Sequence, residues 1–184
     1  MTRTLFFAFL ATVFAAFSAP HGEARDAENT LYLDLKDGRV VIELKPDLAP
    51  QHVERIKTLT REGFYDGIVF HRVIDGFMAQ TGDPTGTGTG GSSYPDLPAE
   101  FTSTPFGRGV VGMARSQNPN SANSQFFIMF DRAAGLDGQY TVFGEVVEGM
   151  EFVDAIKKGD RARNGMVSGP DSIVRMQVAA DADG

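Results

Sequence analysis

Residues 31–44 read LYLDLKDGRVVIEL, and this stretch decides the fold class. Apolar side chains recur at every second position on both sides of the dipeptide Asp37-Gly38, at Leu31, Leu33 and Leu35 and then at Val40, Ile42 and Leu44. Because side chains of a strand point alternately to its two faces, this spacing is typical of strands with one buried face. Asp-Gly suits a type I′ turn. The stretch therefore predicts a β-hairpin with Asp37-Gly38 in its turn.

Six further segments have the composition of strands and are bounded by turn residues. They are Ile68–Ile74, Met78–Thr81, Val110–Ala114, Ser124–Phe130, Thr141–Val147 and Ile173–Val178. Two helices are predicted between them, one that begins at Pro50 and stops at Gly63, and one over Met150–Lys157. About eight strands and two helices in one chain predict a mainly β protein, either a closed antiparallel barrel or a sandwich.

The composition excludes several classes of function. The 184 residues have a formal net charge of −7 and no run of Lys or Arg, so we expect no nucleic-acid partner. The chain contains no cysteine, which excludes disulfides, a thiol nucleophile and a thiolate metal site. His52 lacks the Glu and second His of a zinc-protease helix. We therefore predict no metal site.

The first residues have the pattern of a secretory signal peptide. Arg3 precedes Leu5–Phe17, an uncharged apolar run too short to span a bilayer comfortably, and small residues follow it. We predict that residues 1–24 are a signal peptide and short leader cleaved between 18 and 24, and that 25–184 form one folded domain. An uncleaved membrane anchor is the alternative. The predicted location is outside the cytoplasm, in a bacterial periplasm, with no stable membrane insertion after processing.

The stretch FHRVIDGFMAQ at residues 70–80 is the best candidate for chemistry. Its halves predict antiparallel strands joined near Asp75-Gly76, with Met78 and Gln80 on one face. If Arg72 shares that face, its guanidinium lies beside an amide that can orient it. Downstream, Phe126, Ile128 and Phe130 form an apolar face, and the opposite face mixes an amide with large apolar groups, Gln125, Phe127 and Met129. Such a mixture predicts a binding groove.

These motifs resemble the cyclophilin family in order and spacing. They are the stretch 70–80 with Gly82-Asp83, then 124–128, then Leu136-Asp137-Gly138, and then Val142-Phe143-Gly144. The resemblance covers about Thr30 to Val178. It implies a closed eight-stranded antiparallel barrel capped by two α-helices, and a cyclophilin-like peptidyl-prolyl cis/trans isomerase that assists protein folding without a cofactor. Its partners would be proline-containing unfolded or nascent exported proteins, and the protein would be a monomer.

The resemblance also implies roles for individual residues. Arg72 matches the catalytic arginine, and Gln80 matches the residue that steadies it. The pocket for the proline ring is matched by Phe77, Met78, Phe127 and Leu136. Gln125 and Ala114 match groups that contact the peptide backbone, and Gly88 matches a glycine beside the neighbouring subsite.

Three positions depart from the commonest eukaryotic pattern. Arg115 stands where an Asn is usual, Gly135 where a Trp is usual, and Tyr140 where a His is usual. We include Arg115 and Tyr140 among the predicted substrate-binding residues. Cyclophilins that bind cyclosporin tightly use that Trp, so the resemblance implies weak inhibition here. Departures of this kind resemble bacterial exported members of the family.

One other class of function competes with the isomerase. A proline-binding module or holdase could keep Phe127 and Met78 without Arg72, so the presence of Arg72 beside Gln80 favours an enzyme. The glycine-rich loop 86–91 suggests a nucleotide loop, but it lacks the Lys-Ser/Thr ending of a P-loop and opens no helix. We therefore expect no nucleotide there.

Overall fold

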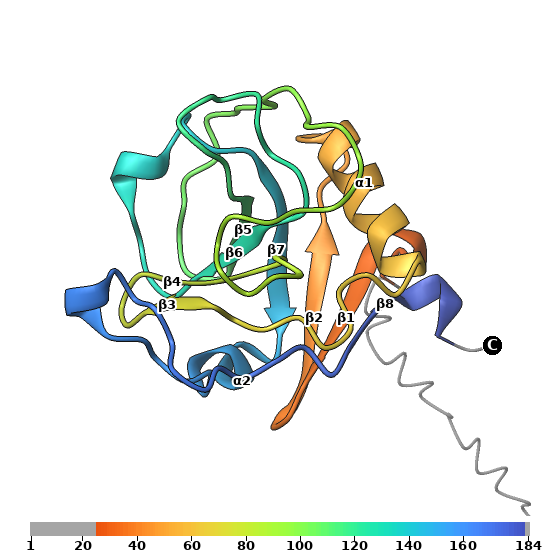
Figure 1. Ribbon diagram of the computed structural model, residues 1–184. Coiled ribbons are helices and arrows are strands. Elements are labelled where there is room, and N and C mark those ends of the chain that lie inside the picture. The colour runs from red at the N-terminus through yellow and green to blue at the C-terminus, as the bar shows by residue number, and fades with distance from the viewer. Residues whose placement is uncertain (1–24, 183–184) are drawn as a thin grey trace, which may run out of the picture.

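The computed structural model describes residues 25–182. The predicted signal peptide lies outside the described residues. Within them the chain forms a single curled eight-stranded sheet (Figure 1). The strands are β1 (Thr30–Leu35), β2 (Gly38–Leu44), β3 (Arg72–Ile74), β4 (Met78–Thr81), β5 (Val110–Met113), β6 (Phe126–Met129), β7 (Val142–Glu148) and β8 (Arg175–Val178). All seven pairings between neighbouring strands are antiparallel.

The sheet is an open half-barrel, so the predicted closed barrel is wrong. The strand order is β3-β4-β6-β5-β7-β2-β1-β8, which leaves β3 and β8 as edges with no ladder between them. Only isolated bridges cross the gap, Val69 to Ser172 and Arg72 to Met166. The predicted strands there are too long: β3 has only three residues, and β8 starts at Arg175. The segment 159–173 contains no strand, and its main chain meets that of residues 68–73 only through these bridges and individual hydrogen bonds.

The first hairpin forms as predicted, with a one-residue difference in its turn. The register pairs Leu35 with Gly38, so the turn residues are Lys36 and Asp37. Gly38 begins β2, and a Cβ there would lie 2.4 Å from the ring of Phe152. The glycine is therefore required by close packing of that ring rather than by the turn.

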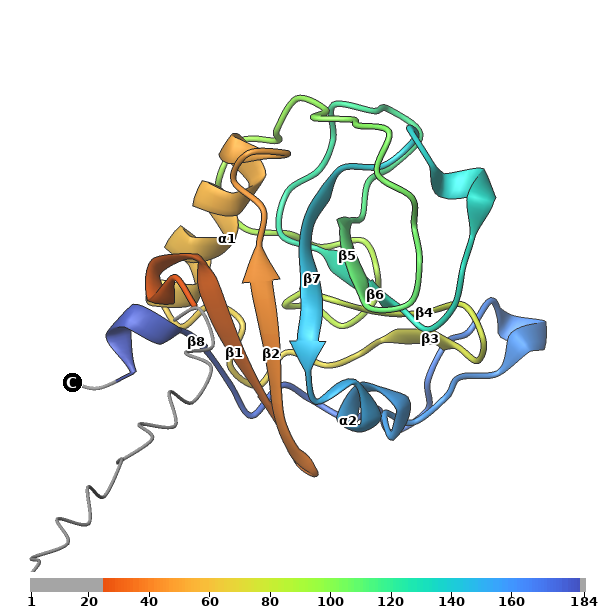
Figure 2. The same ribbon diagram turned by 180° about the vertical axis from the view of Figure 1, so that it is seen from behind.

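Two helices lie on different sides of the half-barrel (Figures 1 and 2). Helix α1 (Pro50–Arg61) has proline in its first turn and buries an apolar face that includes Val53, Ile56 and Leu59. Helix α2 (Met150–Asp154) is shorter than predicted, and Val153 is its buried residue.

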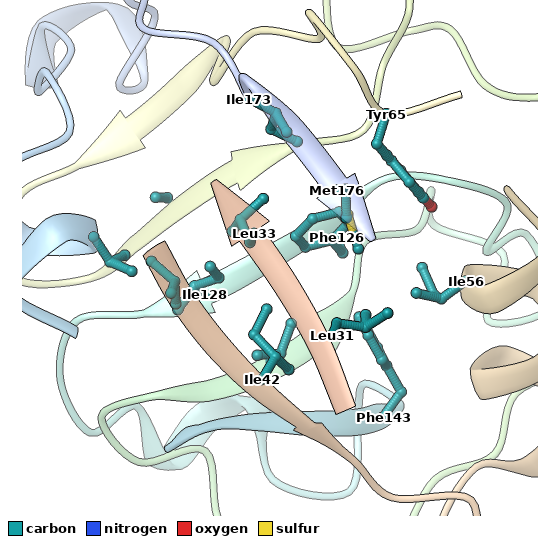
Figure 3. Close-up of a cluster of buried hydrophobic side chains, with 14 of the residues drawn as sticks. Leu31, Leu33, Ile42, Ile56, Tyr65, Phe126, Ile128, Phe143, Ile173 and Met176 are labelled. Atoms are coloured by element: carbon teal, nitrogen blue, oxygen red, sulfur yellow. The ribbon is translucent and has the colours of Figure 1, made fainter. Parts of the chain in front are cut away.

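The main core lies on the concave side of the curled sheet. Leu31, Leu33, Ile42, Phe126, Ile128 and Phe143 from the strands meet Ile56 of α1 and Tyr65 (Figure 3). Each is essentially inaccessible to solvent. Burying such side chains contributes about 1.5–3 kcal/mol each, so this cluster supplies the main stabilisation of a chain without disulfides.

A second apolar cluster lies on the opposite face of β4, β5 and β6. Its buried members are Met78, Phe106, Val110, Phe127, Met129 and Val142. Along β6 the side chains alternate, so that Phe126 and Ile128 belong to the main core while Phe127 and Met129 belong to the second cluster. The predicted division of this strand is confirmed. The second cluster forms the base of the candidate site.

Candidate active site

The β3–β4 hairpin brings Arg72, Met78 and Gln80 together on one face. Arg72 pairs with Gln80 and Ile74 pairs with Met78 in the antiparallel register. Arg72 Nη1 donates to Gln80 Oε1 at 3.1 Å and contacts Met78 Sδ at 3.8 Å. The predicted shared face is confirmed, because residues two apart on one strand point the same way and directly paired residues share a side.

Asn164 holds the other edge of the Arg72 guanidinium. Its main-chain oxygen accepts from Arg72 Nε at 3.0 Å, and its side-chain Oδ1 accepts from Nη2 at 3.1 Å. Asn164 has a φ of 55°, the only left-handed non-glycine residue in the described range. Partial burial lowers the pKa of Arg72 from its ordinary value, yet an arginine stays charged at neutral pH. No salt bridge is formed by this guanidinium within residues 25–182.

An aromatic cluster supports the apolar side of the site. Phe127 is 5% exposed and stacks on Phe106, with ring centroids 5.8 Å apart and planes inclined by 28°. Tyr140 meets the edge of Phe127 with centroids 5.8 Å apart. Gly112 makes room for this packing, since a Cβ there would lie 2.6 Å from the ring of Phe106 and 2.7 Å from that of Phe127. The cluster fixes Phe127 in place.

A small hollow of about 240 Å³ opens beside Arg72. It is lined by nine of the predicted site residues, Arg72, Phe77, Met78, Gln80, Ala114, Arg115, Phe127, Leu136 and Tyr140. Two arginines, Arg72 and Arg115, thus lie at the wall of a hollow whose other lining residues are mostly apolar or aromatic. The other two predicted residues, Gly88 and Gln125, line an adjoining cleft of about 520 Å³ that shares Gln80, Ala114 and Arg115 with the hollow.

The side chain of Gln125 is engaged by the protein itself. Its Nε2 donates to the main-chain oxygens of Gly88 at 3.1 Å and Gly90 at 2.8 Å. Its Oε1 accepts from Gln80 Nε2 at 2.9 Å. The amide therefore links Gln80 to the glycine-rich loop, and only acceptor capacity on Oε1 remains for a peptide.

Asp83 explains why the glycine-rich loop is not a phosphate site. Its carboxylate accepts from the main-chain N–H groups of Thr85, Thr87, Gly88 and Gly90. Burial, which leaves Asp83 1% exposed, raises the pKa of this carboxyl, but the hydrogen bonds outweigh that effect and lower its pKa to about 2. The amides that a phosphate would need are thus occupied by an internal anion.

Sequence reasoning missed three residues of this arrangement. Asn164 lies 92 positions from Arg72, Phe106 lies in a loop, and Asp83 was noted only as part of a motif. The dipeptide Asn164-Gly165 was an available signal, because Asn tolerates the left-handed conformation. Nothing in the sequence places the segment 159–169 beside β3, where Figures 1 and 2 both show it.

His71 points away from the Arg72 hollow and is 6% exposed. Neither of its ring nitrogens has a hydrogen-bond partner in the described part of the chain. Burial lowers the pKa of His71, so its neutral form is favoured. In residues 25–182 no group of His, Cys, Asp and Glu could hold a metal ion, and no helix has the length and apolar character needed to cross a membrane.

Comparisons with known proteins relate the chain to one family. Residues 30–178 match the family model described as cyclophilin type peptidyl-prolyl cis-trans isomerase. A probable peptidyl-prolyl cis-trans isomerase from Brucella suis is 58% identical over 95% of this chain and 96% of its own length. Peptidyl-prolyl cis-trans isomerase B from Bacillus subtilis is 41% identical over 76% of this chain and 99% of its own length.

Two solved structures have the same fold. The cyclophilin AquaCyp293 from Hirschia baltica superposes with a TM-score of 0.77 at 28% identity, over 85% of this chain and 76% of that one. A cyclophilin type isomerase from Cryptosporidium parvum, crystallised in the presence of the dipeptide Ala-Pro, gives a TM-score of 0.74 at 28% identity, over 81% of this chain and 98% of that one.

Proposed function

Because the chain belongs to the cyclophilin-type peptidyl-prolyl cis-trans isomerases, we propose that Arg72 is its catalytic residue and that the hollow beside it receives the proline ring. Phe77, Met78, Phe127 and Leu136 hold the ring while the preceding carbonyl group rotates. No covalent bond forms or breaks during the rotation. The single observation that carries this proposal is that the Arg72 guanidinium, fixed by its neighbours, lies beside the apolar lining residues of the hollow.

The hydrogen bonding of Arg72 suits this role. Three of its five N–H groups donate to oxygens of Gln80 and Asn164, so one on each terminal nitrogen donates to no oxygen within residues 25–182, although Nη1 also contacts the Met78 sulfur at 3.8 Å. As the amide twists, resonance is lost and the proline nitrogen regains a lone pair that can accept a hydrogen bond from Arg72. The donor is oriented before the substrate arrives, so little reorganisation is needed at the transition state.

The energy required is small enough for one such interaction. An uncatalysed prolyl bond isomerises in roughly 10–100 s. A turnover of about 10 s⁻¹ requires a barrier roughly 3–4 kcal/mol lower. A hydrogen bond from a charged donor contributes about 1.5–3 kcal/mol, and the apolar wall strengthens it by excluding water.

The test is Arg72→Ala in a protease-coupled proline-peptide assay on residues 25–184. We expect activity to fall by roughly a hundredfold, because the donor to the rotating bond is lost. The matched control is Arg175→Ala, an exposed arginine at the start of β8. Circular dichroism should show both variants folded, since Arg72 faces the hollow and not the main core. Wild-type turnover by Arg72→Ala would refute the assignment.

The proposed setting is the folding of exported proteins. The protein acts on unfolded or nascent proline-containing chains in a bacterial periplasm, as a monomer and after loss of its leader. The apolar run Leu5–Phe17 after Arg3 supports export. N-terminal sequencing of the exported form should place its first residue between Ala19 and Arg25. A chain that still starts at Met1 in the membrane fraction would contradict this setting.

A further inference from the structure

Positive charge gathers along a groove that consists of three adjoining spaces. The hollow beside Arg72 shares lining residues with the 520 Å³ cleft and with a third cleft of about 500 Å³ between loop 86–88 and segment 163–167. Arg72 and Arg115 each line two of these three spaces, and Arg163 lines the last. Asp96 is the one carboxylate among the lining residues.

This concentration contrasts with the rest of the molecule. The protein has a net charge of −7, and elsewhere in the described range many of its arginines form salt bridges with carboxylates. The paired arginines are Arg25, Arg39, Arg61, Arg108 and Arg132. None of the three groove arginines forms a salt bridge within residues 25–182. The groove therefore presents uncompensated positive charge on an acidic protein.

Arg115 is held in place without being neutralised. Its Nε and Nη2 donate to the main-chain oxygen of Gln139 at 3.2 and 2.8 Å, and Nη1 donates to that of Ser116 at 2.8 Å. The guanidinium also lies 4.5 Å from the ring centroid of Tyr140. All of these partners are neutral, and two of the five N–H groups remain for another acceptor. A cation fixed in this way loses little conformational entropy when it binds an anion.

We propose that Arg115 is a specificity-determining residue that makes this isomerase favour prolyl bonds with an Asp or Glu close to the proline. This inference rests on the proposed function, because it concerns substrates of the same groove. A carboxylate next to the bound ring, or one residue further along, reaches the wall that the hollow and the adjoining cleft share at Arg115. Arg72 and Arg163 add to the attraction, whereas a lysine at the same place is repelled.

The experiment uses peptides capped at both ends, so that no terminal charge interferes. Glu, Gln or Lys is placed in turn at each of the two positions before and after a single proline, and kcat/KM is measured by NMR exchange at about 0.02 M salt. We expect at least one position at which Glu is favoured over Gln by about threefold to tenfold, and Gln over Lys. The Glu-to-Gln ratio should approach one at about 0.5 M salt, because screening shortens the range of the attraction.

Three variants assign the effect to its residue. Arg115→Met should bring the Glu-to-Gln ratio close to one, since it keeps an apolar stem against Tyr140 and removes the charge. Arg115→Lys should keep part of the ratio. Arg175→Met, which changes the net charge equally outside the groove, should leave the ratio as it is. A ratio that survives in Arg115→Met, or no position at which Glu is favoured, overturns the inference. If even the Gln peptides are not isomerised, the proposed function itself fails.

Discussion

Asn164 restricts the Arg72 guanidinium from the side opposite Gln80. Two oxygens of one residue accept from Nε and Nη2, so the plane of the guanidinium is fixed by its neighbours. Asn164 is the left-handed C-cap of the 3-10 helix Arg161–Arg163, a conformation that asparagine adopts readily. Because this cap brings both of its oxygens to the guanidinium, we infer that Asn164 positions Arg72.

Asn164→Gly tests this positioning role. Glycine adopts the same backbone conformation and keeps the main-chain oxygen, but it removes Oδ1 from Nη2. We expect kcat/KM to fall about threefold to tenfold with little change in the thermal midpoint, because only the orientation of the arginine is loosened. Asn164→Asp keeps an acceptor at the same place and should retain more activity. Equal, full activity in both variants would argue against positioning.

Gly135 leaves open space beside the hollow. It lies in the short 3-10 helix Ala134–Leu136, and a Cβ built there meets no atom within 4 Å. Gly135→Trp should therefore fold, with its ring beside Leu136. By resemblance to the family, we expect weak cyclosporin inhibition of the natural protein.

The same substitution should strengthen inhibition by tenfold or more, toward the roughly 30- to 1,000-fold that an aromatic contact and an indole hydrogen bond supply together. Titration of the drug against the natural protein, Gly135→Trp and Gly135→Ala measures this. The Ala variant distinguishes the effect of an added Cβ on inhibition from the effect of the indole ring. Tight inhibition of the natural protein would show that another side chain fills the place of the Trp.

At the scale of elements, the glycine-rich loop is organised around Asp83. The carboxylate binds four main-chain N–H groups, and the loop carbonyls of Gly88 and Gly90 in turn bind Gln125. A chain of contacts thus runs from Asp83 through the loop to Gln125, Gln80 and finally Arg72. The loop acts as a wall of the groove because an internal anion keeps it folded.

Asp83→Asn should disrupt this element. The amide offers one acceptor oxygen where two were used, and its NH₂ group faces backbone donors, so stability should fall by about 1–3 kcal/mol in urea titrations. Hydrogen exchange of the Gly88 and Gly90 amides should accelerate strongly. Asp96→Asn is the control, because Asp96 accepts only from Asn123. Unchanged protection of both glycines in Asp83→Asn would exclude the proposed role of the carboxylate.

Local sequence patterns predicted individual elements better than the joins between them. The alternation of apolar side chains predicted β1 and β2, and their 3.6-residue period predicted α1. Both patterns indicate which side chains face a core. The strand predicted at Ile68–Ile74 is shorter in the structure, where β3 begins only at Arg72. Val69 lies outside it because this residue meets Ser172 only through an isolated bridge. That contact joins residues about a hundred positions apart, and no local period reports it.

In the candidate site too, contacts between residues close in sequence could be predicted, whereas contacts between distant residues could not. Arg72, Met78 and Gln80 share a face because β3 and β4 are adjacent in the chain, so their grouping could be predicted. The contact of Asn164 with Arg72 depends on how segment 159–169 crosses the open edge of the sheet at β3. We did not predict this contact, because a closed barrel would have no such edge. Resemblance supplied the roles of the lining residues, whereas the binding partners of Gln125 appeared only in the structure.

At the scale of the whole molecule, two buried histidines, His52 and His71, make the stability of the protein depend on pH. Burial lowers the pKa of His71, with Asp83 opposing and Arg72 reinforcing that effect. It also lowers the pKa of His52, although Glu100 opposes it. In the unfolded chain both rings take up a proton below a pH of about 6.5, whereas in the folded protein they stay neutral to lower pH. The unfolded state then binds more protons, so stability decreases as pH falls below about 6.5.

His71→Phe isolates the contribution of one ring to this pH dependence. Phenylalanine has a similar ring and no titration, and it removes two buried nitrogens that have no partner within residues 25–182. At a pH of about 8 we expect the variant to be as stable as the natural protein or slightly more stable. Between about pH 6.5 and 5 the natural protein should lose up to about 1.4 kcal/mol per pH unit more than the variant. Urea midpoints of both proteins across this range provide the comparison. Equal slopes would mean that His71 has the same pKa in the folded and unfolded states, and that its burial does not hold it neutral.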